Sequence, residues 1–366
     1  MVYAMMSIGI LGFIVWSCVM ASPYSDIRNT INLAICWNSL VLISTLKGKS
    51  LISYTQSADN LSLYSLKEDN KQSVSETTRE TSFEFSAFRT YFSTLFKDKD
   101  HLSDDWLTWF IGFAEGDGAI QTYSQSKRVR FVITQKESAI LHTIQHKLNI
   151  GVIRHFPQGK SGKNNDFYRW MVDEPAHILL LALLFNGNLA LNHRIKQLAL
   201  WVIALNNRFG SDTLKLKDTP VSITLQDGWI SGFTDAEGCF NVSIVASTRY
   251  SLGHVIKMRY ILDQKDSLIL NKIQELFGFG KVSLKSGTED VYRYTATGFK
   301  GLNRVITYFT LFRLYTKKAI SYKNWLNVHH LVSNKLHLTE EGLAQVRALQ
   351  KQINLNNSTT NKTGAA

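Results

Sequence analysis

One short pattern occurs twice in this chain, and the duplication constrains the fold more than any other feature. The copies are FIGFAEGDG over residues 110–118 and ISGFTDAEG over residues 230–238. Each reads as an apolar helical turn that ends in acidic residues followed by glycine. The small residues within the copies are spaced four apart, Gly112 with Gly116 and Gly232 with Ala236. Because residues at this spacing share one helix face, two such helices can pack closely, and we predict that their acidic ends emerge side by side.

The similarity between the halves continues beyond these motifs. Residues 130–145 read RFVITQKESAILHTIQ and residues 259–274 read RYILDQKDSLILNKIQ. Alternation of apolar and polar residues, as in 128–132, predicts strands, whereas apolar residues at helical spacing, as in 141–148, predict helices. Duplication of a whole unit indicates an α+β protein built from two pseudo-two-fold related αββαββα units.

Both copies resemble the LAGLIDADG motif of homing endonucleases, in the arrangement in which one chain carries two motifs. The resemblance implies saddle-like antiparallel sheets, a central helix pair, and a monomer with internal pseudo-symmetry. It also implies a site-specific endonuclease of intron homing that cuts double-stranded DNA at a long recognition site. The alternative on the same fold is a maturase that binds the host intron RNA and assists its splicing, and one chain can combine both activities.

The family pattern assigns metal binding to the second acidic residue of each motif, Asp117 and Glu237. We expect two or more Mg²⁺ or Mn²⁺ ions shared between these carboxylates, because paired divalent ions activate water and stabilise both the phosphorus centre and the leaving oxygen. Mg²⁺ prefers oxygen ligands, and the C-terminal end of a helix favours cations. The earlier acidic residues, Glu115 and Asp235, are expected to support the helix ends.

The resemblance also implies supporting catalytic residues. Gln135 and Gln264 match the polar residue of the family's TQK turn. The basic residue that precedes the last tryptophan of each half matches the catalytic lysine: Lys318, with Lys317 beside it, in the second half and Arg194 in the first. Arginine does not release a proton and binds phosphate in a different geometry from lysine. We therefore predict that the two DNA strands are cut at unequal rates.

Charge indicates the class of partner. The chain has 41 Lys and Arg against 29 Asp and Glu, a net charge of +12 that favours a nucleic acid partner. A two-stranded ribbon fits the DNA major groove, where Arg, Gln and Asn read base edges. The candidate DNA contacts are polar residues that alternate outward on the predicted strands: Gln121, Tyr123, Arg154, Arg169, Asn241, Ser243, Ser283, Lys285 and Arg293. The three cysteines form no CxxC pair, which argues against a disulfide framework or a cysteine-rich zinc site.

The segment before the repeats has a different composition. Residues 1–20 carry no charge and have the length of a membrane span, and residues 1–17 strongly resemble a transmembrane segment of cytochrome c oxidase subunit I. A membrane protein of the respiratory chain is a third interpretation, which rests on these residues alone. We expect instead a reading frame that runs from an exon into an intron of an organelle gene, and a protein of the mitochondrion.

Composition divides the chain into five parts. We predict an apolar exon-derived segment at 1–46, a polar linker at 47–102, the first repeat at 103–210, the second repeat at 220–334, and a C-terminal helix with a frayed tail at 335–366. Ser103 is a suitable N-cap for the first motif helix.

Overall fold

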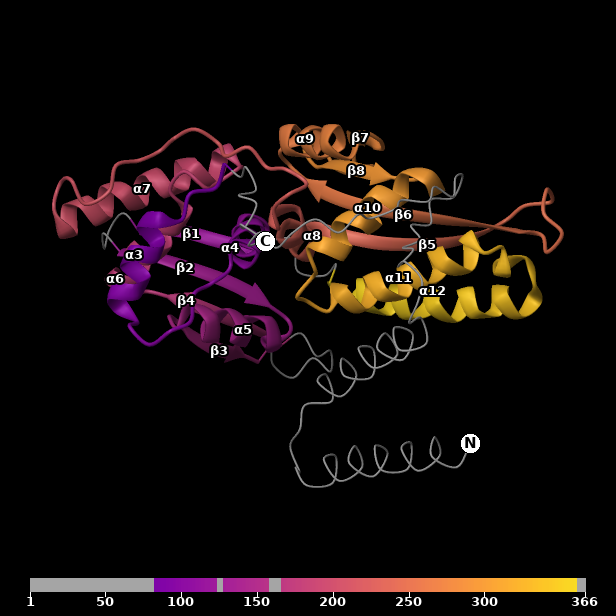
Figure 1. Cartoon of the computed structure of the whole chain (residues 1–366), viewed down its shortest axis with the longest axis horizontal. Coiled ribbons are helices and arrows are strands. Elements are labelled where there is room, and N and C mark those ends of the chain that lie inside the picture. The colour runs from indigo at the N-terminus through magenta and orange to yellow at the C-terminus, as the bar shows by residue number, and fades with distance from the viewer. Residues whose placement is uncertain (1–81, 124–127, 158–165, 361–366) are drawn as a thin grey trace, which may run out of the picture. The chain divides into compact units, whose positions relative to one another are not determined.

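Two repeats of one element order follow each other along the chain. The structure is a computed structural model that describes residues 82–123, 128–157 and 166–360 (Figure 1). The segment predicted at 1–46 and the first part of the predicted linker lie outside these residues. None of the helices within the described ranges is long and apolar enough to cross a membrane.

The elements of the first repeat are α4 (Asp104–Asp117), β1 (Gly118–Tyr123), β2 (Arg128–Gln135), α5 (Ser138–Leu148), β3 (Val152–Phe156), β4 (Phe167–Val172), α6 (Pro175–Phe185) and α7 (Asn192–Phe209). Those of the second are α8 (Trp229–Glu237), β5 (Gly238–Ala246), β6 (His254–Gln264), α9 (Ser267–Phe277), β7 (Lys281–Leu284), β8 (Tyr292–Ala296), α10 (Phe299–Leu311) and α11 (Lys318–Ser333). A short 3₁₀ helix, η1 (Leu336–Leu338), and α12 (Glu340–Thr360) follow.

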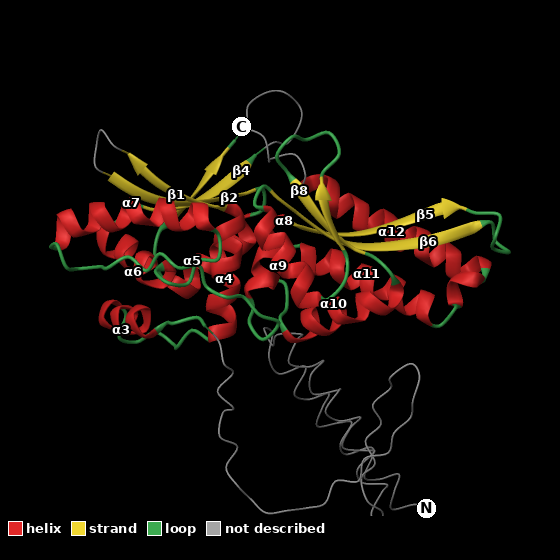
Figure 2. Cartoon of the chain, turned by 90° about the horizontal axis from the view of Figure 1, so that it is seen from above, coloured by secondary structure: helices red, strands yellow, loops and turns green. Residues whose placement is uncertain are grey.

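Each repeat contains one four-stranded antiparallel sheet. The strand orders are β1-β2-β4-β3 and β5-β6-β8-β7, so the two sheets have the same topology. Figure 2 shows both sheets on one side of the repeats and the helices on the other. The predicted α+β class with two related repeats is confirmed. Each repeat ends in two helices rather than one, so α7 and α11 extend the predicted αββαββα order.

Strand alternation separates a buried face of each sheet from an open face. On β2, Phe131 and Ile133 are fully buried, and Ile133 pairs with the equally buried Trp170 of β4. On β6, Tyr260 and Leu262 are buried in the same way. These residues belong to the core between sheet and helices, which leaves the side chains of the alternate positions on the open face.

The motif helices α4 and α8 pack against each other through backbone. A Cβ built on Gly112 would lie 2.1 Å from Trp229 O, and one built on Gly232 would lie 1.8 Å from Trp109 O. These distances are far below van der Waals contact, so a side chain at either position would push the helices apart. The small residues thus allow the close approach that holds the two repeats together.

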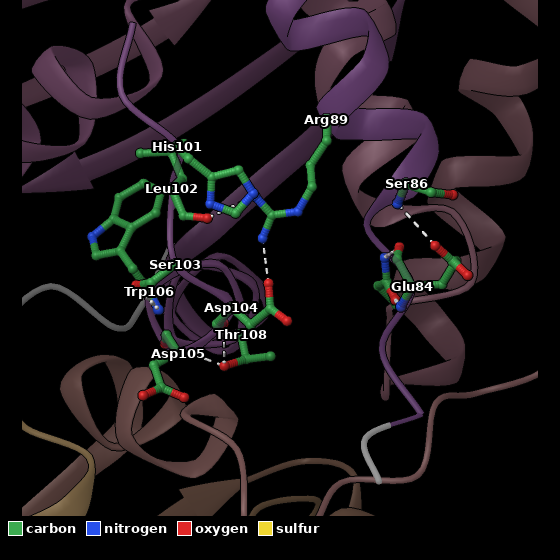
Figure 3. A network of polar contacts seen from close by, with 11 residues as sticks. Glu84, Ser86, Arg89, His101, Leu102, Ser103, Asp104, Asp105, Trp106 and Thr108 are labelled. Atoms are coloured by element: carbon green, nitrogen blue, oxygen red, sulfur yellow. Dashed lines mark hydrogen bonds and ion pairs between the residues drawn. The ribbon is translucent and has the colours of Figure 1, made fainter. Parts of the chain in front are cut away.

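Residues 82–102 belong to the folded part of the chain, so the linker predicted over 47–102 is wrong for this stretch. They include α3 (Ser86–Leu95), whose Phe88 and Phe92 are buried against the first repeat. Glu84 and Asn188 exchange two hydrogen bonds of 2.7 and 2.8 Å. Arg89 of α3 forms an ion pair with Asp104 in the first turn of α4 (Figure 3).

The start of the first repeat and the C-terminal helix are both held by side-chain contacts. Ser103 is the N-cap of α4, and its side chain accepts a hydrogen bond from Trp106 N at 3.4 Å. Helix α12 buries Val346 and Ile353. Its Gln350 Nε2 donates to Val242 O of β5 at 3.1 Å. The C-terminal helix therefore covers the outer part of the second repeat.

Candidate active site

The two motif helices end at the carboxylates that the motif pattern singled out. Helix α4 ends at Asp117 and α8 ends at Glu237, and a strand begins at the next residue in each case. Both carboxylates line one cleft of about 870 Å³. Four further predicted catalytic residues line the same cleft, namely Gln135, Gln264, Lys317 and Lys318. Arg194 is not among its lining residues.

The two carboxylates share an enclosed, electrostatically unfavourable position. Burial raises the pKa of Asp117. Burial and the negative charge of Asp117 raise the pKa of Glu237 to about 7, and the Lys318 ammonium acts against both shifts. Both side chains keep partial exposure to the cleft. A divalent cation between the two carboxylates would relieve their mutual repulsion. The open space of the cleft leaves room for the water molecules that complete the coordination of such an ion. No larger group of His, Cys, Asp or Glu in the described ranges is arranged to hold a metal.

The two predicted glutamines differ in their contacts. Gln135 Nε2 donates to Asp117 Oδ2 at 2.6 Å. Gln264, at the matching place in the second repeat, instead accepts a hydrogen bond through Oε1 from Lys265 N at 2.7 Å. Only the first repeat therefore has its glutamine bound to the motif carboxylate in this structure.

Lys318 and Arg194 occupy matching positions at the helix ends. Lys318 is buried, and its Nζ donates to Ala236 O at 2.6 Å and to Thr234 O at 3.2 Å. Arg194 donates through Nη2 to Glu115 O at 2.8 Å and to Gly116 O at 3.3 Å. Both side chains therefore donate to carbonyl groups in the last turn of a motif helix, where backbone carbonyls lack partners further along the helix; Thr234 O also accepts from Gly238 N. Lys318 also lines the cleft, whereas Arg194 contacts these carbonyl groups and does not line the cleft.

The residue before each of these basic residues faces the other repeat. Lys317 Nζ forms an ion pair of 2.6 Å with Glu137, the N-cap of α5 in the first repeat. His193, the matching residue, lies within the electrostatic influence of Asp266, the N-cap of α9 in the second repeat. Lys317 thus links the two repeats at the edge of the cleft.

The candidate DNA contacts lie on the open faces of the sheets, except for one. Gln121 and Tyr123 share a face of β1, and Asn241 and Ser243 share a face of β5. Two cross-strand pairs show the same placement: Arg154 of β3 with Arg169 of β4, and Ser283 of β7 with Arg293 of β8. Lys285 follows the end of β7 and lies in the connection to β8 rather than on a strand.

Cross-strand register adds basic residues that the strand-by-strand interpretation missed. Arg130 pairs with Gln121, Arg259 with Asn241, and Lys257 with Ser243, so all three lie on the open faces. Pairing the two strands of each predicted hairpin would have identified them, because directly opposed residues share a face.

Two matching arginines of the open faces are held in different ways. Arg169 lies beside the stacked rings of Phe156 and Phe167, with its Cζ 5.0 and 4.9 Å from the ring centroids. Arg293 forms two hydrogen bonds of 2.6 and 2.7 Å with Asp263, which also pairs with Lys285 at 3.0 Å. Part of the positive charge that we assigned to DNA contact in the second repeat is therefore neutralised by a carboxylate.

Comparison with known proteins agrees with this architecture. A family model described as LAGLIDADG endonuclease matches residues 230–329. Probable intron-encoded endonuclease 4 of Neurospora crassa is 35% identical over 257 residues, which cover 69% of this chain and 45% of that protein. An uncharacterized cox1 intron-2 protein of Schizosaccharomyces pombe is 22% identical over 245 residues, which cover 65% of this chain and 70% of that protein.

A solved structure shows the same fold. The LAGLIDADG meganuclease I-AabMI, bound to uncleaved DNA, has a TM-score of 0.55 and 23% sequence identity, over 68% of this chain and 99% of that chain. The chain therefore resembles the LAGLIDADG endonuclease family over residues 230–329, and its fold is that of a meganuclease of this type. It spans about 45% of the length of the Neurospora relative.

Proposed function

We propose that this protein is a site-specific DNA endonuclease that hydrolyses one phosphodiester bond in each strand with the help of divalent metal ions. The observation that carries the proposal is the meeting of Asp117 and Glu237, one from each repeat, in a single cleft. The basic open faces of both sheets support double-stranded DNA as the partner. A maturase needs no such carboxylates, so their presence in both motifs favours the nuclease.

Asp117 and Glu237 are the residues that would hold the metal. Mg²⁺ or Mn²⁺ between them would supply an activated water and neutralise charge at phosphorus. Gln135 is placed to orient Asp117, since it donates to that carboxylate at 2.6 Å. Lys318 holds the end of α8 and adds positive charge beside both carboxylates. The cleft that would hold the metal ions thus lies between the two sheets that would bind the DNA.

The N-terminal resemblance to a cytochrome c oxidase exon supports an organelle intron as the location of the gene. The Schizosaccharomyces relative, which is named for a cox1 intron, supports the same origin. We therefore propose a mitochondrial protein whose DNA target is the uninterrupted cytochrome c oxidase subunit I gene.

Plasmid cleavage tests the proposed function. The purified protein in Mg²⁺ should linearise a supercoiled plasmid that carries this gene without introns, and should leave the empty plasmid intact. Asp117→Asn and Glu237→Gln should each abolish double-strand cleavage while DNA binding in a gel-shift assay persists. Glu275→Gln changes an exposed carboxylate of α9 that pairs with Lys272; it is the matched control and should cut normally. Full cleavage by either motif variant would refute the assignment of the metal ligands.

A further inference from the structure

The earlier acidic residue of the first motif connects three parts of the molecule. Glu115 is 1% exposed. Its carboxylate accepts hydrogen bonds from Leu191 N at 2.7 Å and from Ala190 N at 3.0 Å, directly before α7. It also accepts one from Trp229 Nε1 of the second repeat at 2.7 Å. One buried carboxylate therefore holds the start of a helix in its own repeat and an indole of the other repeat.

Asp235 repeats this arrangement in the second motif. Its carboxylate accepts hydrogen bonds from Tyr315 N at 2.7 Å and Thr316 N at 3.2 Å, in the segment that leads into α11. The donor from the other repeat is Trp109 Nε1 at 2.9 Å. The ring of Trp109 also packs on Tyr315, with ring centroids 4.6 Å apart. The crossed contact thus occurs twice, once in each direction.

The helices that these carboxylates hold carry the two basic residues that match the family's catalytic lysine. Arg194 lies in the first turn of α7, and Lys318 is the first residue of α11. Each donates back to carbonyl groups at the end of its own motif helix. The motif helix and the following helix are therefore joined by two contacts, one through the carboxylate and one through the basic side chain. A shift of the carboxylate would then also shift the basic side chain.

We propose that Glu115 and Asp235 are positioning residues that fix Arg194 and Lys318, each with the help of a tryptophan from the opposite repeat. Trp109 of the first repeat would then support Lys318 of the second, and Trp229 would support Arg194. This inference rests on the proposed nuclease function. Its consequence is crossed: a change in one repeat impairs the cleavage that depends on the basic residue of the other.

The physical reason lies in the buried carboxylate. Loss of an indole N–H removes one of two donors to a carboxylate oxygen, which keeps only Ala190 N in Glu115 or Tyr315 N in Asp235. A buried carboxylate with fewer donors is destabilised. The carboxylate then moves toward its remaining backbone donors and shifts the start of the following helix. A displacement of about 1 Å at a reacting group is enough to slow a reaction about 100-fold.

Tryptophan-to-phenylalanine variants test the proposal. A duplex that contains the mapped cleavage site, labelled differently on its two strands, gives a single-turnover rate for each strand. Lys318→Ala identifies the strand that depends on Lys318. Trp109→Phe should slow that same strand about 10-fold or more and leave the other within about 2-fold. Trp229→Phe should do the reverse, on the strand that Arg194→Ala slows.

Two other tryptophans provide matched controls. Trp106 on α4 and Trp325 on α11 are fully buried, and neither indole N–H donates a hydrogen bond. Trp106→Phe and Trp325→Phe therefore make the same change in ring size without removing a donor. They should leave the ratio of the two strand rates unchanged, and the Kd for the labelled duplex should be unchanged in all four variants.

A second pair of variants covers the case in which a tryptophan variant does not fold. Asp235→Asn should slow the same strand as Trp109→Phe, and Glu115→Gln the same strand as Trp229→Phe. Combining Asp235→Asn with Trp109→Phe should slow that strand no more than the worse single change, since both act on one contact.

The outcomes separate this inference from the proposed function. Equal slowing of both strands, or unchanged rates, in the variants of an active wild-type enzyme would refute the crossed positioning role alone. Absence of cleavage by the wild-type protein would refute the nuclease function and the positioning role with it.

Discussion

Gly232→Ala adds one methyl group where α4 and α8 touch, and we expect it to lower the free energy of unfolding by at least about 3 kcal/mol. A Cβ at this position would lie 1.8 Å from Trp109 O and 2.8 Å from Phe113 N. Both atoms are backbone atoms of a buried helix, so no flexible side chain can move aside. Overpacking costs ~1–3 kcal/mol even where side chains can shift. The ~1 kcal/mol by which alanine exceeds glycine in a helix offsets only part of this loss.

Urea unfolding followed by circular dichroism measures this effect. Gly287→Ala is the control, because its Cβ would meet nothing within 4 Å and only its positive φ of 80° opposes the change, at a cost of about 1–2 kcal/mol. Gly112→Ala should resemble Gly232→Ala. The double variant should cost less than the sum of the two, since the first methyl group already separates the helices. Equal stability of Gly232→Ala and Gly287→Ala, or strict additivity in the double variant, would refute this account of the interface.

Three further changes have defined outcomes. A chain that begins at residue 103 should have a free energy of unfolding several kcal/mol lower than one that begins at 82, because each buried phenylalanine lost with α3 contributes ~1.5–3 kcal/mol. Equal urea midpoints of the two chains would mean that α3 contributes nothing. Arg194→Lys should shorten the time for which nicked plasmid persists, because lysine at this place can donate to the helix end as Lys318 does. An unchanged time course would mean that Arg194 does not cause the unequal cleavage of the two strands. Burial lowers the pKa of His329, so protonation favours the unfolded chain as pH falls below about 6.5. His329→Phe should therefore lose less stability in acid than the wild type, and parallel pH profiles of the urea midpoints would contradict this.

The motif helices, the strand pairs and the paired carboxylates could be predicted from sequence because each depends on local spacing. Gly112 and Gly232 indicated the helix pair, and the acidic residues that follow them on each helix emerged in one cleft. The order of elements followed from periodicity alone, apart from the extra helix that closes each repeat.

Contacts between distant residues could not be predicted in this way. The bonds from Trp109 to Asp235 and from Trp229 to Glu115 join residues more than a hundred positions apart, and no local pattern encodes them. Helix α3 was hidden by composition, because its buried phenylalanines stand among serine, threonine and charged residues. The Arg293–Asp263 pair was missed because the outward position of a charge does not reveal whether a neighbour neutralises it.

The two repeats agree where they hold the site and differ where they would meet DNA. Both motifs use a buried carboxylate, a crossed tryptophan and a basic residue at the helix end, and this shared scaffold places Asp117 and Glu237 in one cleft. On the open faces, by contrast, Thr134 stands opposite Arg169 in the first sheet, whereas Asp263 stands opposite Arg293 in the second. A chain with two repeats can vary each face independently, because the two faces need not bind the same sequence. On the proposed function, these unequal faces fit a DNA target whose two half-sites differ.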